Sequence, residues 1–210
     1  MPTIAIIVIL FIAGSFIVGA ARAPFVSECG RGWWRGVVFL GSGLIIVAVT
    51  GFCGAGLVAL GAIPLPASFE WPVGRVGGVF TTSEGLHVVP HAPTGRIQVY
   101  DANWRFLRGW QVDASGGVFD LAVPTPERVE VFTARGQRHC VFGIDGHLIS
   151  DGSYQIGAPN TIRGKGETVT VPTPLWAWVF CHPFLSWGAI LMGALLLNWE
   201  HKNRQRRSPR

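Results

Sequence analysis

Three long apolar stretches, separated by polar segments, dominate the pattern of hydrophobic and polar positions along the chain. They cover Thr3–Ala21, Val37–Leu65 and Leu175–Trp199, which are 19, 29 and 25 residues long. A helix rises about 1.5 Å per residue, so each stretch approaches or exceeds the roughly 30 Å of a bilayer core. Buried helices of soluble proteins usually carry a polar face, which these stretches lack. The pattern therefore predicts three transmembrane helices.

Positive residues predict how these helices are oriented. Arg22, Arg31 and Arg35 follow the first stretch, and the C-terminal tail holds five Lys or Arg residues. Positive residues are retained in the cytoplasm. A signal peptide cleaved near Ala21–Ala23 is the alternative for the first stretch, but Met1–Thr3 lacks the positive start that such a peptide needs. We expect a multi-pass protein of the plasma (inner) membrane, with its N-terminus outside and its C-terminus in the cytoplasm.

These expectations divide the chain into six segments. They are a first transmembrane helix at 1–21, a basic cytoplasmic loop at 22–36, a second transmembrane helix at 37–65, an extracytoplasmic domain at 66–173, a third transmembrane helix at 174–199 and a basic cytoplasmic tail at 200–210. The extracytoplasmic domain has nine basic and ten acidic residues, so the net charge of +5 resides in the cytoplasmic segments. This distribution argues against a nucleic-acid partner.

The composition agrees with a membrane protein. Hydrophobic residues make up 49% of the 210 residues and charged residues only 14%, whereas charged residues make up about 25% of average soluble domains. These values exclude an ordinary soluble domain and also a disordered chain, which needs more charge. The chain has 15 Arg against two Lys and no N-x-S/T sequon, which favours a bacterial source.

Tryptophan residues cluster near the ends of the predicted membrane helices. Indole rings favour the boundary between the bilayer core and water because they combine an apolar body with one polar N–H group. We therefore expect five membrane-interface anchors, which are Trp33, Trp34, Trp176, Trp178 and Trp199.

His182 is the candidate polar site inside the membrane. It lies within the third apolar stretch beside Pro183, which removes a backbone donor and favours a kink. An ionisable side chain at this depth is either functional or bonded to a neighbouring helix or to carbonyls that the kink frees. Small residues four apart occur in each stretch and favour close helix packing. They are Ser15 and Gly19, Gly51 and Ala55, and Ala189 and Gly193.

The region between the second and third stretches alternates apolar and polar residues with period two. The segments Arg96–Tyr100 and Arg128–Phe132 show this alternation, which is typical of half-buried strands. Candidate strands begin near residues 86, 96, 105, 118, 128 and 138, and Gly-rich or Asn-rich turns separate them. Such spacing predicts an antiparallel β-rich domain. Cys140, the one cysteine in this domain, has no disulfide partner there and is expected to be a small buried side chain. The alternative is an intermolecular disulfide.

A short internal repeat accompanies the strands, since Gly77–Phe80 recurs as Gly116–Phe119 and the Arg96 segment recurs at Arg128. In addition, Gly95–Asp101 and Arg105–Trp110 resemble the outer strands of an NHL-type β-propeller blade, and Phe119–Val123 is similar to the opening strand of the next blade.

The resemblance covers residues 77–144 and implies two blades at most, where such propellers have about six. Two arrangements deal with the open edges of so few blades. Several copies of the chain complete a ring, or one twisted sheet or small sandwich covers its edges with its own loops.

Motifs of catalysis are absent from the sequence, which lacks G-x-S-x-G, G-x-x-x-x-G-K, H-E-x-x-H and C-x-x-C patterns. His87 and His91 are four apart, but Val88–Pro90 between them favours a strand over a metal-binding helix. We therefore expect no enzyme, no cofactor and no metal site.

The expected function is a membrane-anchored interaction or assembly module that displays its β-domain outside the cytoplasm. Its partners would be the lipid bilayer and either further copies of the chain or other membrane proteins. The alternative is an accessory subunit of a transport or membrane-enzyme complex, acting through its helices around His182.

Overall fold

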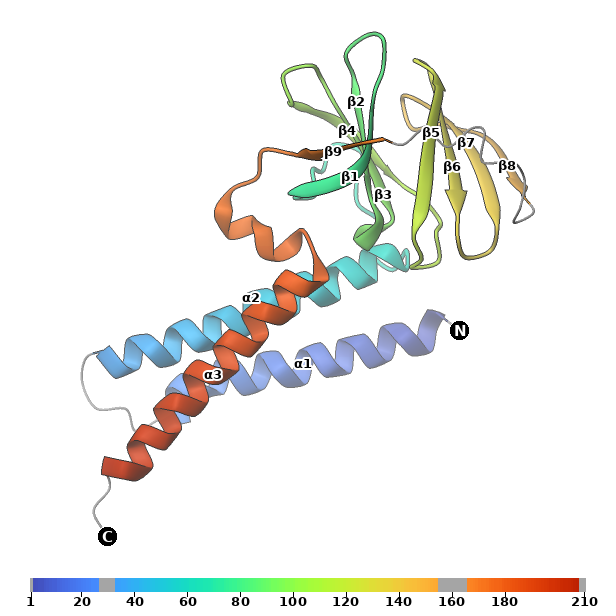
Figure 1. Ribbon diagram of the computed structural model, residues 1–210. Coiled ribbons are helices and arrows are strands. Elements are labelled where there is room, and N and C mark those ends of the chain that lie inside the picture. Colours follow the sequence, from blue (N-terminus) through green and yellow to red (C-terminus); the bar gives the residue numbers. More distant parts are fainter. Residues whose placement is uncertain (1, 27–32, 155–165, 208–210) are drawn as a thin grey trace. The chain divides into compact units, whose positions relative to one another are not determined.

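The computed structural model describes residues 2–26, 33–154 and 166–207, and they fall into two compact units (Figure 1). One unit combines Met1–Gly54 with His182–Arg210, and its described part is helical. The other unit spans Ala55–Cys181, and its described part contains nine strands and the last turn of a helix. We call them the helical unit and the strand unit.

The helical unit contains α1 (Pro2–Val26), α3 (Pro183–Arg207) and most of α2 (Trp33–Ala59). Its core is formed by Ala13, Ala20, Ile45 and Val49, with partly buried side chains such as Ile190 and Leu197 packed against them. The backbones of α2 and α3 approach closely, because a Cβ atom on Gly193 would lie 2.6 Å from the carbonyl oxygen of Gly41. Gly193 belongs to one of the predicted small-residue pairs.

The prediction of three transmembrane helices is not supported as it stands. Among the residues that the structure describes, one helix, Arg35–Ala59, is long and apolar enough to cross a membrane. The apolar part of α1 there is the shorter stretch Leu10–Arg22. In α3 the apolar run ends at Leu197, and the remaining turns are polar up to Arg207. In the third stretch, hydropathy along the chain overstated the span because it ignored that α3 starts only at Pro183.

The predicted third span, 174–199, is two elements rather than one helix. A 3₁₀-helix, η3 (Leu175–Phe180), belongs to the strand unit, and α3 starts only at Pro183. Proline lacks an N–H group and disfavours helical backbone at the residue before it, so it begins a helix well but interrupts one. Pro183 therefore separates the two elements.

The second predicted span, 37–65, ends six residues early for a similarly local reason. Gly61 has a left-handed φ of +72°. The N–H of Gly61 bonds to the carbonyl of Val58 at 2.9 Å, and the N–H of Ala62 bonds to that of Leu57 at 2.9 Å. This pair of bonds is a Schellman motif, which closes α2 at Ala59.

The strands form two antiparallel sheets, as the sequence predicts. The first sheet has the order β4-β3-β2-β1-β9 and the second has the order β5-β6-β7-β8. The bounds are β1 (Arg75–Thr81), β2 (His87–His91), β3 (Arg96–Tyr100), β4 (Phe106–Gln111), β5 (Phe119–Thr125), β6 (Arg128–Thr133), β7 (Arg138–Gly143), β8 (Leu148–Ser153) and β9 (Glu167–Thr170), with η1 (Ala92–Thr94) after β2. All six predicted strand starts are confirmed to within one residue.

Each sheet contains a four-stranded meander, β1–β4 in the first and β5–β8 in the second. Four strands are also the content of one propeller blade. The repeat, however, does not relate the two meanders. Gly77–Phe80 and Gly116–Phe119 both lie at the first strand, but the Arg96 segment is the third strand of its sheet and the Arg128 segment is the second. The repeated segments therefore occupy inequivalent places.

The two sheets share one apolar core. It takes Val88, Ile97 and Val99 from the first sheet and Leu121, Val129 and Val131 from the second, with Cys140 also buried in it. The prediction that Cys140 is buried is confirmed. Its thiol is free within this chain. Cys29 lies outside the described residues.

Candidate interaction surface

His182, the predicted polar site, lies just before α3 rather than inside a helix, and its side chain is exposed. Its Nδ1 atom accepts a hydrogen bond from the N–H of Phe184 at 3.2 Å. Its backbone carbonyl accepts from Leu185 at 3.0 Å. The first N–H groups of a helix have no partner within the helix. His182 therefore caps α3, which gives it a structural role.

Of the predicted interface anchors, Trp178 and Trp199 have described side chains. The Nε1–H of Trp178 donates to the carbonyl of Thr173 at 3.3 Å, and the ring lies beside Gly74 in the strand unit. Trp199 is 48% exposed on α3. The side chains of Trp33, Trp34 and Trp176 lie outside the described set. Anchoring by these residues stays a prediction.

The first sheet holds the connector, residues 60–74, through polar side chains of β3. The guanidinium group of Arg96 donates to the carbonyls of Leu65 at 3.3 Å, Pro66 at 2.8 Å and Phe69 at 2.9 Å. The amide of Gln98 accepts from the N–H of Trp71 at 2.6 Å and donates to its carbonyl at 2.9 Å. Prolines make the connector rich in acceptors and poor in donors, which suits these donating side chains.

Two more polar side chains, those of Gln111 and His91, form hydrogen bonds with residues near the first and last positions of the strand unit. Gln111 donates from Nε2 to the carbonyl of Val58 in the last turn of α2 at 3.0 Å and to that of Thr94 at 2.6 Å. His91 contacts the hydroxyl of Thr94 at 2.7 Å and the carbonyl of Cys181 at 3.0 Å. We call Arg96, Gln98, Gln111 and His91 the connector clamp.

Burial sets the electrostatics of the clamp. Arg96 is 0% exposed, and burial lowers the pKa of its guanidinium group. Burial, followed by the nearby carboxylate of Glu70, raises the pKa of Tyr100 well above its ordinary value. A buried charge is tolerated when hydrogen bonds replace its lost hydration. The three carbonyls bonded to Arg96 have this role, so the clamp is a structural device.

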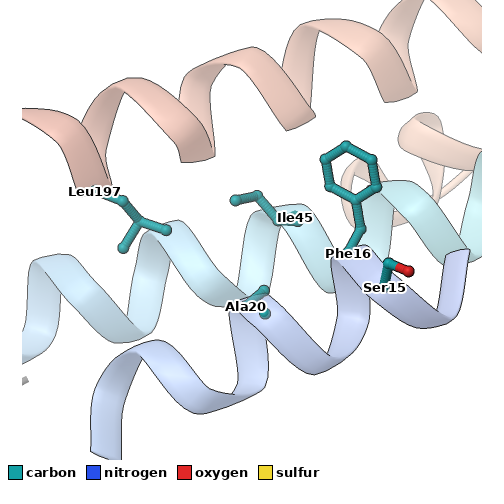
Figure 2. Close-up of a pocket in the computed structure, with 6 residues that line it drawn as sticks. Ser15, Phe16, Ala20, Ile45 and Leu197 are labelled. Atoms are coloured by element: carbon teal, nitrogen blue, oxygen red, sulfur yellow. The ribbon is translucent and has the colours of Figure 1, made fainter. Parts of the chain in front are cut away.

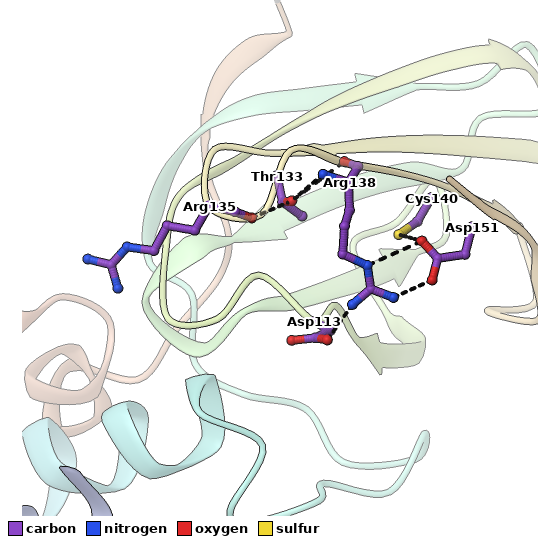
Figure 3. A network of polar contacts seen from close by, with 6 residues as sticks. All are labelled: Asp113, Thr133, Arg135, Arg138, Cys140 and Asp151. Carbon is purple, nitrogen blue, oxygen red and sulfur yellow. Dashed lines mark hydrogen bonds and ion pairs between the residues drawn. The ribbon is translucent and has the colours of Figure 1, made fainter. Parts of the chain in front are cut away.

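The second sheet carries an exposed polar network (Figure 3). Arg138 forms ion pairs with Asp113 and Asp151, and the thiol of Cys140 donates to Asp151 at 3.4 Å. Burial, helped by Asp151, raises the pKa of Cys140 to about 11. The thiolate is the nucleophilic form of cysteine. Cys140 is therefore protonated at neutral pH and is not activated for nucleophilic attack.

β8 forms an outer edge of the second sheet. All six of its residues are exposed, and the adjacent Leu148 and Ile149 are 45% and 51% exposed. Among the strands that the structure describes, β8 pairs with β7 alone. An exposed edge strand offers a row of unpaired N–H and C=O groups to another polypeptide. β8 is therefore the candidate interaction surface.

The alternation of apolar and polar residues in the sequence predicts neither the connector clamp nor the exposed edge at β8. The alternation in β3 predicts a half-buried strand, and it does not show that Arg96 and Gln98 on the other face are buried as well. The exposure of β8 follows from its place at the end of the strand order. One signal did point to the clamp, since prolines 64, 66 and 72 leave the connector with carbonyls that need donors.

No metal cluster occurs within residues 2–26, 33–154 and 166–207, where no three His, Cys, Asp or Glu side chains are grouped to hold an ion. His87 instead stacks on Trp104 with 4.1 Å between ring centroids, and His91 belongs to the clamp. Comparison with protein-family models, with curated proteins and with solved structures finds no match for this chain.

Proposed function

We propose that this protein is a membrane-anchored interaction module. Its helices lie in the plasma membrane as a multi-pass bundle, and the strand unit is displayed outside the cytoplasm. There β8 recruits an extended segment of a partner polypeptide, which adds as a further strand to the second sheet. The structure describes one helix that is long and apolar enough to span a membrane, within α2. The proposal adds α1 and α3 as membrane helices.

Exposed apolar side chains support the membrane location. In all three helices, large hydrophobic residues face outward, and the most exposed include Phe11, Phe39, Leu40, Phe184, Leu191 and Leu195. Soluble monomers rarely expose contiguous apolar patches larger than a few hundred Å². Lipid removes this penalty, and helices satisfy the backbone polar groups that a bilayer cannot.

The observation that carries the interaction role is the exposed edge of β8. Among the other edge strands, β5 lies against β1 of the first sheet. β4 is closed in part by the connector, because the N–H of Gly109 donates to the carbonyl of Ala67 at 2.9 Å. β9, at the opposite edge of the first sheet, has only four residues. Strand addition supplies main-chain hydrogen bonds, and the exposed Leu148 and Ile149 supply apolar contact area.

Photo-crosslinking in intact cells tests this role. A photoreactive amino acid at Ile149 is expected to give a discrete crosslinked product, whereas the same group at Leu107 is not. Leu107 is a matched control because it is 43% exposed on β4 of the other sheet. With the photoreactive group kept at position 149, Leu148→Lys on the same strand should abolish the product while leaving the melting temperature unchanged, because a charge on an edge strand discourages pairing. Equal products from positions 149 and 107 would contradict the proposal.

Cysteine labelling tests the orientation. In a Cys29→Ser background, Ser150→Cys should react with a membrane-impermeant maleimide in intact cells, because β8 is exposed. Lys202→Cys, in an exposed position near the end of α3, should react only after the membrane is permeabilised. The reverse pattern would show that the strand unit faces the cytoplasm.

A further inference from the structure

The helical unit contains a pocket of about 350 Å³ between its three helices (Figure 2). Ser15, Phe16, Gly19 and Ala20 of α1 line it, together with Ile45 of α2 and Leu197 of α3. The volume is more than ten times the about 30 Å³ that one water molecule occupies in the liquid. The pocket therefore has room for a ligand.

The lining of this pocket is apolar. Its single hydroxyl group, on Ser15, already donates to the backbone carbonyl of Phe11 at 2.9 Å. A polar ligand would lose its hydration there without gaining new hydrogen bonds. The pocket thus favours an unbranched or branched alkyl chain.

Basic residues follow the pocket on two of the helices. α1 and α3 run in the same direction (Figure 1), and both continue past the pocket toward their C-terminal ends. Arg22 lies two residues beyond Ala20, and Lys202 lies five residues beyond Leu197. At about 1.5 Å per residue, these positions are about 3 and 7.5 Å further along the helices. Both side chains are exposed.

One acidic residue, Glu200, lies near this end of α3, against the two cations Arg22 and Lys202. Glu200 is buried at 7% exposure and has interactions of its own. The structure therefore combines an apolar slot with a positive end. This combination is complementary to a molecule with an alkyl chain and a negative headgroup.

The geometry points to a binding site for an anionic phospholipid of the surrounding bilayer. One acyl chain fills the pocket, and the phosphate group lies near Arg22 and Lys202. The inference rests on the proposed membrane location of the helices. Basic side chains at the membrane surface attract anionic lipids, and the pocket adds a place for one chain of such a lipid.

Labelling with photoreactive lipids tests the site in the full chain. The protein is reconstituted into phosphatidylcholine liposomes that contain a trace of phosphatidylglycerol with a diazirine on its acyl chain. Gly19→Leu fills the pocket, and Gly14→Leu is the matched control. Neither glycine has a heavy atom within 4 Å of its would-be Cβ, apart from its own helix backbone and chain neighbours. The Cβ atom of either variant therefore meets no neighbouring group.

We expect labelled peptides from α1 around residues 15–20, at least fivefold less label in Gly19→Leu, and less than a twofold change in Gly14→Leu. The double variant Arg22→Gln with Lys202→Gln should lower labelling by the phosphatidylglycerol probe at least threefold. It should leave labelling by a phosphatidylcholine probe unchanged.

Flotation of the liposomes separates this inference from the proposed function. If the protein does not float, the membrane location fails and the lipid site fails with it. If it floats but both glycine variants label equally, the label comes from lipids around the bundle and only the site is overturned. If both probes respond equally to the double variant, the preference for anionic lipid is overturned.

Discussion

Two strands with nearly the same sequence have opposite environments. β3 reads Arg-Ile-Gln-Val-Tyr, and the first five residues of β6 read Arg-Val-Glu-Val-Phe. Both strands put their second and fourth residues into the shared core. In β3 all five residues are buried. In β6 Arg128 is exposed, and Glu130 and Phe132 are half-buried. Alternation therefore predicts which face enters the core, but a covering segment decides whether the other face meets water.

The covering segment of β3 is the connector, and the chemistry of its face matches that role. Arg96 and Gln98 donate to backbone carbonyls that no strand pairs with. On the corresponding face of β6, the polar side chain finds its partner on the neighbouring strand β7. Glu130 lies 3.2 Å from Nε2 of His139, whose ring stacks on Phe132 with 4.5 Å between centroids.

The largest difference in the free energy of unfolding is expected between variants of the two arginines, Arg96 in β3 and Arg128 in β6. Arg96→Met should lower the free energy of unfolding by about 3 kcal/mol, because it removes the three hydrogen bonds by which the buried guanidinium group holds the connector. Arg128→Met should change it by less than about 0.5 kcal/mol, because its side chain is exposed. Denaturant unfolding of the full chain in detergent measures both values. Equal losses would show that the connector does not depend on Arg96.

Exchanging the third residues makes each strand resemble the other. Gln98→Glu removes the donor to Trp71 and buries a carboxylate, so we expect a loss of about 2 kcal/mol. Glu130→Gln removes only a half-exposed pair with His139, with an expected loss below about 1 kcal/mol. The same unfolding measurements apply. A larger loss for Glu130→Gln would reverse the comparison.

Tyr100→Phe, which gives β3 the fifth residue of β6, has the smallest expected effect of the three β3 substitutions at neutral pH. It removes the hydrogen bond from Gln98 at 3.0 Å, worth about 1 kcal/mol. The pKa of Tyr100 is raised in the folded state, so its contribution is full below the unfolded value of about 10 and is lost as pH rises above it. Stability of the variant should therefore fall less steeply above pH 10. Parallel curves for the two proteins would contradict this assignment.

Local periodicity was enough to predict the strands but not the helix ends. β3, β6 and β7 begin where the alternation begins, because both side-chain spacing and turn residues are short-range features. The apolar stretches, in contrast, continue past Gly61 and across Pro183, where backbone geometry stops the helices. Hydropathy alone carries no information about these stops.

The hydrogen-bond partners of the clamp side chains could not be predicted from the sequence, for another reason. Gln98 contacts Trp71 and Gln111 contacts Val58, and these partners are 27 and 53 residues away in the chain. Only the tertiary fold brings the connector over β3. The exposed apolar edge of β8 depends in the same way on strand order, which sequence spacing does not specify.

The connector clamp also has a mechanical consequence. Hydrogen bonds run from Val58 through Gln111 to Thr94, and from Thr94 through His91 to Cys181. Tension applied at Val58 and Cys181 therefore loads this side-chain path before it loads the sheets. In a pulling experiment with handles at these two positions, the first rupture should precede any unravelling of strands and should disappear in Gln111→Leu. The force then passes through the side chains of Gln111 and His91, and the sheets of the strand unit bear little of it until this path breaks.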